Sequence, residues 1–327
     1  MPSGVAQSHT VLNYSGQLFD TTNTDTPLVS SLPRRNTSSM EFVINSTYAT
    51  EPAATISISE TASLKAPEPT FITRAQSKNT VQIFQYTTAV SYIKQANTAT
   101  LAGVNLAGQS NNVNSEFDFQ MAGKTRKARL DLENALINST YAEATNDSTA
   151  AQTRGLIEAI TTNTKAASNA ELNFDLLNEV LRTMFKNNAD MSNLVIMCDA
   201  ITKAQITNNW SKLPGFYLPQ SRNVGGIAID QIITDSGTLG IMQHRMIPAG
   251  TALIVNLAAL QIVEMPIPGK GNFFWEPLAK EGAGEKGMLF GTAGLDYGPE
   301  WYHGKITGLS TSVKPINEAA VPVNLKA

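Results

Sequence analysis

A glycine-rich run at residues 282–287, Gly-Ala-Gly-Glu-Lys-Gly, matches the G-x-G-x-x-G pattern of dinucleotide-binding loops. Such a loop binds a pyrophosphate only when a strand precedes it and the N-terminus of a helix follows it. Here the following residues predict a strand, so we interpret the run as a flexible turn. Residues 298–305 resemble a phosphate-binding loop, but the run is one residue too long, and Ile306 replaces the hydroxyl residue that would hold magnesium.

Histidine and cysteine, which carry much of protein chemistry, are few and scattered. His9, His244 and His303 are the only histidines, and no cysteine or acidic residue accompanies them at the spacing of a zinc site. Cys198 is the only cysteine, and the apolar run around it, residues 194–198, predicts that it lies in the core. The sequence also contains no G-x-S-x-G motif. We therefore expect no catalytic, cofactor-binding or metal-binding residues, and no enzyme.

The composition points instead to a chain that buries polar surface. Charged residues make up 16% of the 327 residues, well below the roughly 25% of an average soluble domain. A polar surface with few charges can be buried against another copy of the chain without leaving charged side chains buried and unpaired. A β-rich domain of the extracellular type is the alternative interpretation. The net charge of −3 argues against a dedicated nucleic-acid binder but is compatible with a surface that faces nucleic acid without gripping it.

The sequence predicts neither a secretory signal nor a membrane span. Residues 1–10 lack the apolar stretch that a signal peptide needs. The most apolar stretch, residues 246–260, is interrupted by Pro248, Gly250 and Asn256 and is shorter than the ~20 residues that cross a bilayer. We therefore expect a protein that is made and folded in the cytosol and has no membrane partner.

The first 39 residues predict an arm without a core of its own. They show no sustained hydrophobic period, and Pro27 and Pro33 interrupt them. Arg34 and Arg35 form the only basic pair of this segment. We expect the arm to become ordered only against a partner.

Residues 40–98 predict two long strands that close on a distant tip at residues 66–69, Ala-Pro-Glu-Pro. In the first predicted strand, Ile56 and Ile58 alternate with polar residues. In the second, the alternation predicts that one face carries Phe84, Tyr86, Val90 and Tyr92. A two-stranded hairpin of this kind is marginally stable in water. It therefore packs either on its own domain or across a neighbour.

Charge is scarce beside this hairpin. Between residues 79 and 115 the only charged residue is Lys94, so we expect contact with other subunits here. The few charges near the tip are candidates for setting the register on a neighbour, and they are Lys65, Glu68, Arg74 and Lys78.

A helix is predicted at residues 126–144, with a narrow apolar stripe formed by Ala128, Leu132, Ala135, Leu136 and Ser139. Basic residues, among them Arg126 and Arg129, crowd its expected start, which the helix dipole does not favour. These side chains are interpreted either as a solvated face or as contacts to acidic groups of a neighbour or to phosphate.

The middle of the chain predicts a small α/β unit. A second helix is expected at residues 173–186 with Asn173 as its N-cap, followed by a strand at residues 194–198 and a helix capped by Asp199. Further short strands are predicted between residues 227 and 263.

Taken in order, these segments resemble the major capsid proteins of tailed bacteriophages, whose fold is often called the Hong Kong ninety-seven type. Residues 13–18 and 25–30 resemble the N-arm of that family, residues 42–92 its E-loop, and the helix from Arg126 its spine helix. The return into the peripheral domain is matched by residues 264–266, 276–280, 294–296 and 303–306.

The resemblance implies an α+β fold of five parts. These are an N-arm (1–39), an E-loop (40–98), a peripheral domain with the spine helix (99–149), an axial α/β domain (150–262), and a return to the peripheral domain with a C-terminal tail (263–327). Residues expected between subunits are Arg34, Arg35, Lys65, Glu68, Arg74, Lys78, Lys94, Arg126 and Arg129.

The function that the resemblance implies is self-assembly. The subunit would form hexamers and pentamers of an icosahedral head that encloses double-stranded DNA, with the E-loop over one neighbour and the N-arm beneath another. Implied partners are further copies of the chain, scaffolding, portal and decoration proteins, and packaged DNA contacted non-specifically, and assembly takes place in the host cytoplasm. Two alternatives stay open: an encapsulin-like compartment, and a tail tube or tail spike protein.

Overall fold

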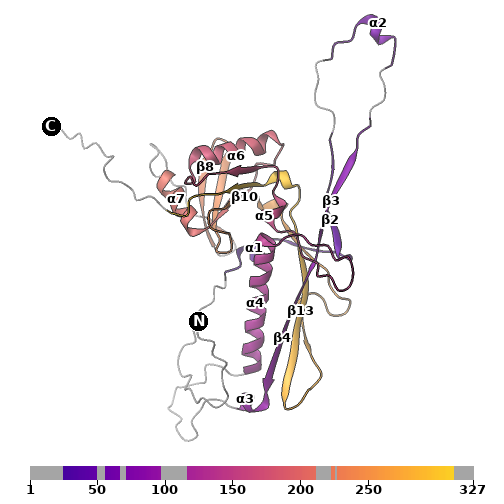
Figure 1. Ribbon diagram of the computed structural model, residues 1–327, viewed down its shortest axis with the longest axis vertical. Coiled ribbons are helices and arrows are strands. Elements are labelled where there is room, and N and C mark those ends of the chain that lie inside the picture. The colour runs from indigo at the N-terminus through magenta and orange to yellow at the C-terminus, as the bar shows by residue number, and fades with distance from the viewer. Residues whose placement is uncertain are drawn as a thin grey trace, which may run out of the picture.

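The computed structural model describes residues 25–49, 56–66, 71–96, 116–210, 222–224 and 227–312. The described chain has an elongated part around α4 and β13, a more compact part around β10, and a hairpin, β2–β3, that extends away from both (Figure 1). Helices and sheets both contribute, as the predicted α+β class requires. Within these residues no helix is long and apolar enough to cross a membrane.

The compact part is built on a mixed seven-stranded sheet. Its strands, in spatial order, are β5 (Thr164–Ala166), β14 (Gly304–Thr307), β10 (Ala252–Asn256), β6 (Leu194–Cys198), β9 (Gly237–Gln243), β8 (Ile227–Thr234) and β7 (Arg222–Val224). Every residue of β6 and β10 is buried, because both faces of the sheet are covered. One face packs against α6 (Phe174–Lys186), and the other faces the core shared with α4 and α5 (Leu156–Ala159).

The predicted α/β unit is confirmed. The side chain of Asn173 accepts a hydrogen bond from Leu176 N at 2.9 Å and caps α6. Asp199 accepts one from Thr202 N at 2.9 Å and caps α7 (Ala200–Trp210). Cys198 is fully buried in β6, as predicted, and burial raises the pKa of its thiol to about 12.

The strand β14 lies in the compact part. Residues 263–327 are predicted to form the return to the peripheral domain and a C-terminal tail, whereas β14 pairs with β10 and β5 inside the seven-stranded sheet. A four-residue strand that pairs with partners far away in sequence carries no periodic signal of its own. The chain therefore returns first to the elongated part and then to the compact one.

The elongated part combines one long helix with a sheet whose central strand is β13 (Gly284–Asp296). β13 pairs along most of its length with β4 (Gln82–Ser91), and also with β12 (Phe274–Pro277) and β11 (Gln261–Glu264). Figure 1 shows α4 (Glu116–Asn138) running beside β4 and β13. The alternation predicted in β4 is confirmed within the strand, because Phe84 and Val90 are buried and Tyr86 is half-buried, whereas their neighbours in sequence point to solvent. It is wrong for Tyr92, which is exposed and begins a helix.

The long helix has different ends from those predicted. It begins at Glu116, ten residues before the expected start, and ends at Asn138, six before the expected end. Its first turn carries the acidic residues Glu116 and Asp118, which the helix dipole favours. Near its start Phe117 packs edge-on against Trp275, with ring centroids 5.6 Å apart. The basic cluster that includes Arg126 therefore lies inside the helix and not at its N-terminus.

The predicted stripe of this helix is confirmed for its four apolar members, which are the buried residues Ala128, Leu132, Ala135 and Leu136. The fifth, Ser139, lies just after the helix ends. Asn138 ends the helix, and its amide donates to Met246 O at 2.8 Å.

Part of the expected N-terminal arm packs within the subunit. Residues 1–24 lie outside the described chain, but α1 (Pro27–Ser31) and β1 (Arg34–Asn36) are packed within the subunit itself. Leu28 is fully buried, and β1 pairs in parallel with β11. The prediction that all 39 residues need a partner is wrong for residues 27–36. Parallel pairing over three residues leaves no pattern in the sequence that could have revealed it.

A buried carboxylate joins α1 to the rest of the subunit. Glu133 of α4 is fully buried and accepts hydrogen bonds from Leu28 N and Val29 N, both at 2.8 Å. Its Oε1 also lies 2.6 Å from Nε2 of His244, which follows β9. Because Nδ1 of His244 accepts from Met246 N, the ring proton is assigned to Nε2 and is donated to Glu133. One side chain thus satisfies donors from two other parts of the fold.

We expect Glu133→Gln to lower the free energy of unfolding by about 3 kcal/mol. A glutamine amide keeps one oxygen but turns an NH₂ group toward donors, so at least one buried N–H loses its acceptor. The urea midpoint of the unassembled variant subunit measures this. The matched control is Asp131→Asn, a more exposed carboxylate on the same helix, for which we expect at most about 1 kcal/mol. Equal losses for both variants would contradict a special role for Glu133.

Candidate assembly surfaces

The hairpin formed by β2 (Glu41–Tyr48) and β3 (Arg74–Thr80) is anchored at its base. Phe42 is buried there against Val81 and Val263. Lys78 bridges two carboxylates, Glu41 at 3.0 Å and Glu143 at 3.3 Å. These ionic hydrogen bonds raise the pKa of Lys78 and lower the pKa of Glu41. The base is therefore fixed in register before any partner binds.

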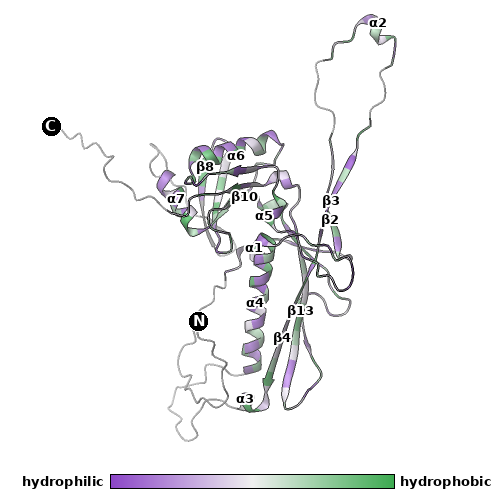
Figure 2. Ribbon diagram, in the orientation of Figure 1, coloured by the Kyte–Doolittle hydropathy of each residue, from purple (hydrophilic) through white to green (hydrophobic). Residues whose placement is uncertain are grey.

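Beyond the base, the hairpin has no second layer. Its two strands form a sheet of their own, and Figure 2 shows the distal part standing clear of the remaining described chain. At the tip lies a short helix, α2 (Glu60–Ser63), whose N-terminus is capped by the side chain of Ser59. A two-stranded ribbon has too little core to be stable alone in water.

Large apolar side chains gather on this distal part. Phe71 is 87% exposed, Leu64 85% and Ile56 81%. Four further apolar residues of the hairpin are exposed as well, namely Val43, Tyr48, Ile58 and Ile72. The strand predicted through Ile56 and Ile58 is wrong, because residues 56–59 belong to no strand. Several large apolar side chains exposed on one hairpin favour a protein contact site.

The predicted E-loop, residues 40–98, is shorter in the structure. β4 falls in that range, yet it pairs with β13 over ten residues and belongs to the elongated part. The hairpin whose strands, β2 and β3, pair only with each other therefore lies between residues 41 and 80. The expected contact region at residues 79–115 is divided accordingly, because β4 lies in the subunit's own sheet and residues 97–115 lie outside the described chain.

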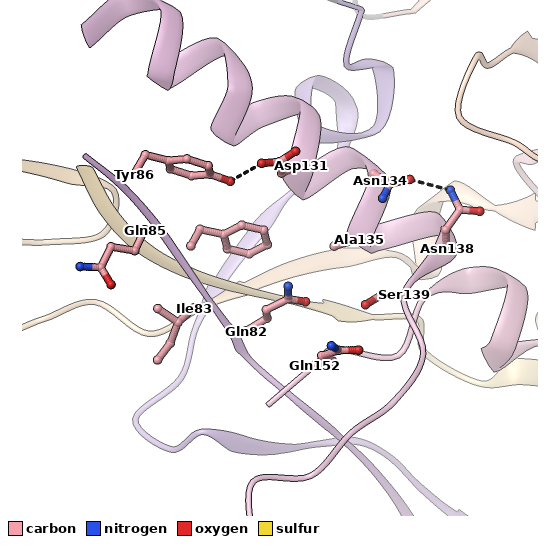
Figure 3. Close-up of a pocket in the computed structure, with 11 residues that line it drawn as sticks. Gln82, Ile83, Gln85, Tyr86, Asp131, Asn134, Ala135, Asn138, Ser139 and Gln152 are labelled. Atoms are coloured by element: carbon pink, nitrogen blue, oxygen red, sulfur yellow. Dashed lines mark hydrogen bonds between the residues drawn. The ribbon is translucent and has the colours of Figure 1, made fainter. Parts of the chain in front are cut away.

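A polar hollow of about 390 Å³ lies between β4 and α4 (Figure 3). Amide side chains from several elements line it, including Gln82, Asn134, Asn138 and Gln152, whereas the amide of Gln85 at its edge points away (Figure 3). At one end Tyr86 donates its hydroxyl to Asp131 at 2.6 Å, and burial raises the pKa of Tyr86, so the phenol stays protonated. Amides donate and accept equally well, which suits the backbone of another chain more than a charged substrate.

The histidines hold structural positions. His303 is fully buried, its Nε2 lies 2.7 Å from Tyr297 O, and its Nδ1 accepts from Asn256 N. Burial lowers the pKa of His303 to about 4, so the ring is neutral at physiological pH. His244 is buried against Glu133, and His9 lies outside the described chain. Across the described ranges, no group of three potential metal-ligating side chains comes together.

The two glycine-rich runs also serve the fold. The first run continues into a strand and not into a helix, as predicted, but β13 already begins at Gly284, so the interpretation of the run as a turn is wrong for residues 284–287. In the second run Lys305 lies in β14 and donates to Ile157 O at 2.7 Å, and burial lowers its pKa. Neither run precedes a helix of the kind that binds phosphate.

Several candidate intersubunit residues have partners within the subunit. Arg34 contacts Glu264 at 2.5 Å, and Arg35 contacts Asp296 at 2.6 Å. The two pairs lie on opposite faces of the sheet where β1 joins β11, because successive side chains of a strand alternate between its faces. Burial raises the pKa of Asp296 despite its arginine. Lys78 is held by the two carboxylates described above. Lys94 of α3 (Tyr92–Ala96) contacts Glu116 at the start of α4 at 3.2 Å.

The other candidates are more accessible. Lys65 and Arg74 are exposed on the distal hairpin, and Arg126 and Arg129 are exposed on α4. Glu68 lies outside the described chain. The structure therefore does not bring the nine predicted residues together into one site. The exposed apolar residues of the hairpin were missed, although Leu64, Phe71 and Ile72 beside a predicted tip were a visible signal.

A family model described as SU10 major capsid protein matches residues 1–310. Among solved structures, a chain of the cyanophage A-1(L) capsid asymmetric unit is similar with a TM-score of 0.63 and 12% identity, over 91% of this chain and 96% of that one. A chain of the holo-SrpI encapsulin complex from Synechococcus elongatus PCC 7942 has a TM-score of 0.60 and 11% identity, over 88% and 89%.

A chain from Mycobacterium phage Patience has a TM-score of 0.58 and 10% identity, over 88% of this chain and 83% of that one. No curated protein matches the chain. At these identities the solved structures show the fold alone, which is the predicted capsid fold. The family model covers nearly the whole chain. The helices, sheets and hairpin of the chain are arranged as in the matched capsid structures. The chain belongs to the SU10 major capsid protein family and is a structural subunit of an icosahedral virion head.

Proposed function

We propose that the hairpin formed by β2 and β3 lies with its distal part across a neighbouring copy of the chain. This contact joins the subunits into the hexamers and pentamers of a head that encloses double-stranded DNA. The observation that carries the proposal is the apolar surface of the hairpin, above all Leu64 and Phe71, on a ribbon without a core. Burial of such surface contributes about 25 cal/mol per Å². Permanent interfaces between subunits commonly exceed about 2,000 Å².

Charged side chains at the hairpin would then set its position along the neighbouring subunit. Lys65 and Arg74 are exposed near the apolar residues, and Glu68 belongs to the same tip in sequence. Charges at the edge of an interface contribute specificity and association rate more than affinity. Arg34, Arg35, Lys78 and Lys94 are already paired within the subunit, so we assign them first to holding its shape and only their exposed sides to a neighbour.

We infer the remaining partners from separate observations and from the family. Arg126 is an exposed cation of α4, which suits acidic groups of a neighbour or the phosphates of packaged DNA. The polar hollow of Figure 3 suits an extended segment of a scaffolding or decoration protein. A portal protein would replace one pentamer. The chain's net charge of −3 fits an inner shell surface that contacts DNA weakly and non-specifically.

An encapsulin-like compartment is the second candidate, because the fold matches the Synechococcus encapsulin about as well as it matches the phage capsids. Such a shell would enclose cargo protein and no genome. The two candidates share every interface described above, and only the contents separate them.

The contents of shells isolated from the natural producer therefore test the function. We expect nuclease-resistant double-stranded DNA inside them, at an absorbance ratio of 260 to 280 nm typical of a nucleoprotein. Shells that hold a single abundant foreign protein and no protected DNA would support the encapsulin alternative and contradict a phage head.

The hairpin contact is tested by replacing Ile58, Leu64 and Phe71 together with serine. All three side chains are exposed, so the unassembled subunit should keep its melting temperature within about 2 °C. Assembly should fail, because the apolar surface that drives it is gone. Sedimentation and electron microscopy of the purified variant measure both results.

The matched control changes only Thr61 and Thr73 of the same hairpin, each to serine. This variant should assemble like the parent protein, because it leaves the apolar surface intact. Closed shells of normal size from the Ile58, Leu64 and Phe71 variant would contradict the proposed role of the hairpin.

A further inference from the structure

A second hollow, of about 410 Å³, lies on the opposite side of α4 from the polar one and has an apolar lining. Its walls are one face of α4, including Met121 and Leu132, and the strands β12 and β13, with Val29 of α1 at one end. Exposed Arg129 and Asp118 stand at its edge. We call this hollow the α4 groove. Its size is in the range of pockets that bind small ligands or a few peptide side chains.

The floor of the α4 groove is built by glycine. The ring of Trp275 lies directly on Gly287, where a Cβ would come within 2.1 Å of it, and the ring of Phe273 lies on Gly291, where a Cβ would come within 2.4 Å. Leu289 lies between the two glycines on the same face of β13 and also lines the groove. Because the rings lie flat against the strand, they leave a wide apolar floor with space above it.

This apolar floor needs a cover. We propose that residues Leu18-Phe19-Asp20 of the same chain occupy the α4 groove, with the two apolar side chains over Trp275 and Phe273 and the carboxylate of Asp20 beside Arg129. This inference does not depend on what the shells contain or on the hairpin contact. It concerns the unassembled subunit.

The position of α1 favours this segment. Val29 itself lines the groove, and Asp20 precedes it by nine residues, which span at most about 30 Å. The groove follows α4 from Asp118 to Leu132, a distance of about 21 Å. Residues 18–20 can therefore reach any part of it. The other end of the described chain, Ser312, is held by Gln205 of α7, on the compact part and away from α4 (Figure 1).

The charges at the α4 groove also favour residues 18–20 as its occupant. Arg129 is exposed at the groove, and no ion pair of Arg129 is present among the described residues. Leu18-Phe19-Asp20 places an acid directly after two large apolar residues, so the apolar side chains can contact the floor while the carboxylate lies beside Arg129 and away from Asp118. The C-terminal residues 313–327 contain apolar residues too, but their starting point disfavours them.

The test is a disulfide between Phe19→Cys and Thr125→Cys in the unassembled subunit. Thr125 is an exposed residue of the groove wall, and the native Cys198 is fully buried. Under mild oxidation we expect a bond within one chain, seen by peptide mass spectrometry. The matched control pairs Phe19→Cys with Asn134→Cys, an exposed position on the other side of α4, and should give at least five-fold less product.

Charge reversal gives a second readout. Asp20→Lys should lower the yield of the Phe19–Thr125 disulfide at least three-fold, and the added change Arg129→Glu should restore it. Three outcomes would overturn the inference: no disulfide, equal yields with Thr125 and Asn134, or a disulfide that forms only between two chains. The last of these would show that the segment occupies the groove of a neighbour.

Discussion

The structure depends on one continuous run of extended chain, residues 74–91, which changes its surroundings at Val81. After Val81 it is β4, paired with β13 and covered by α4, so its alternate residues are buried. Before Val81 it is β3, paired with β2, and only its last residues, Asn79 and Thr80, are buried at the base, whereas residues 74–76 are exposed. The same run thus anchors the hairpin in a stable sheet at one end and leads at the other to the segment with exposed Leu64 and Phe71, which we propose contacts another molecule. Its stability and its capacity to assemble come from opposite ends of one element.

A contact at the hairpin can be transmitted because the subunit is tied together by buried polar groups. Glu133 holds α1 and His244 against α4, and His303 connects the start of β14 to the loop after β13. A buried carboxylate is costly unless its hydrogen bonds are complete, so such a network favours one arrangement of the parts. The ion pairs of Arg34 and Arg35 add a second tie at β1. The elongated and compact parts are therefore expected to move as one body when the hairpin engages a neighbour.

The sequence predicted the elements that carry a local signal. The capped helix α6, the buried strand β6 and the alternation in β4 follow from patterns over five to thirteen residues. It did not predict β1 and β14, because short strands are chosen by distant partners. It misplaced the start of α4, whose first turns are held by an aromatic contact to Trp275. It also could not show that Arg34 and Arg35 have partners within the chain, since an ion pair across more than 200 residues leaves no trace in spacing. Lys94 pairs with Glu116, which lay outside the predicted helix.

The most direct test of the account is hydrogen–deuterium exchange of the hairpin, compared between unassembled subunits and closed shells. Peptides that cover residues 56–66 and 71–74 should exchange at least ten-fold more slowly in shells, because a neighbour covers them. Peptides of residues 144–151, a surface loop of the subunit, serve as the internal reference. Equal exchange of the hairpin in both states, with intact shells, would contradict the claim that this ribbon closes the head.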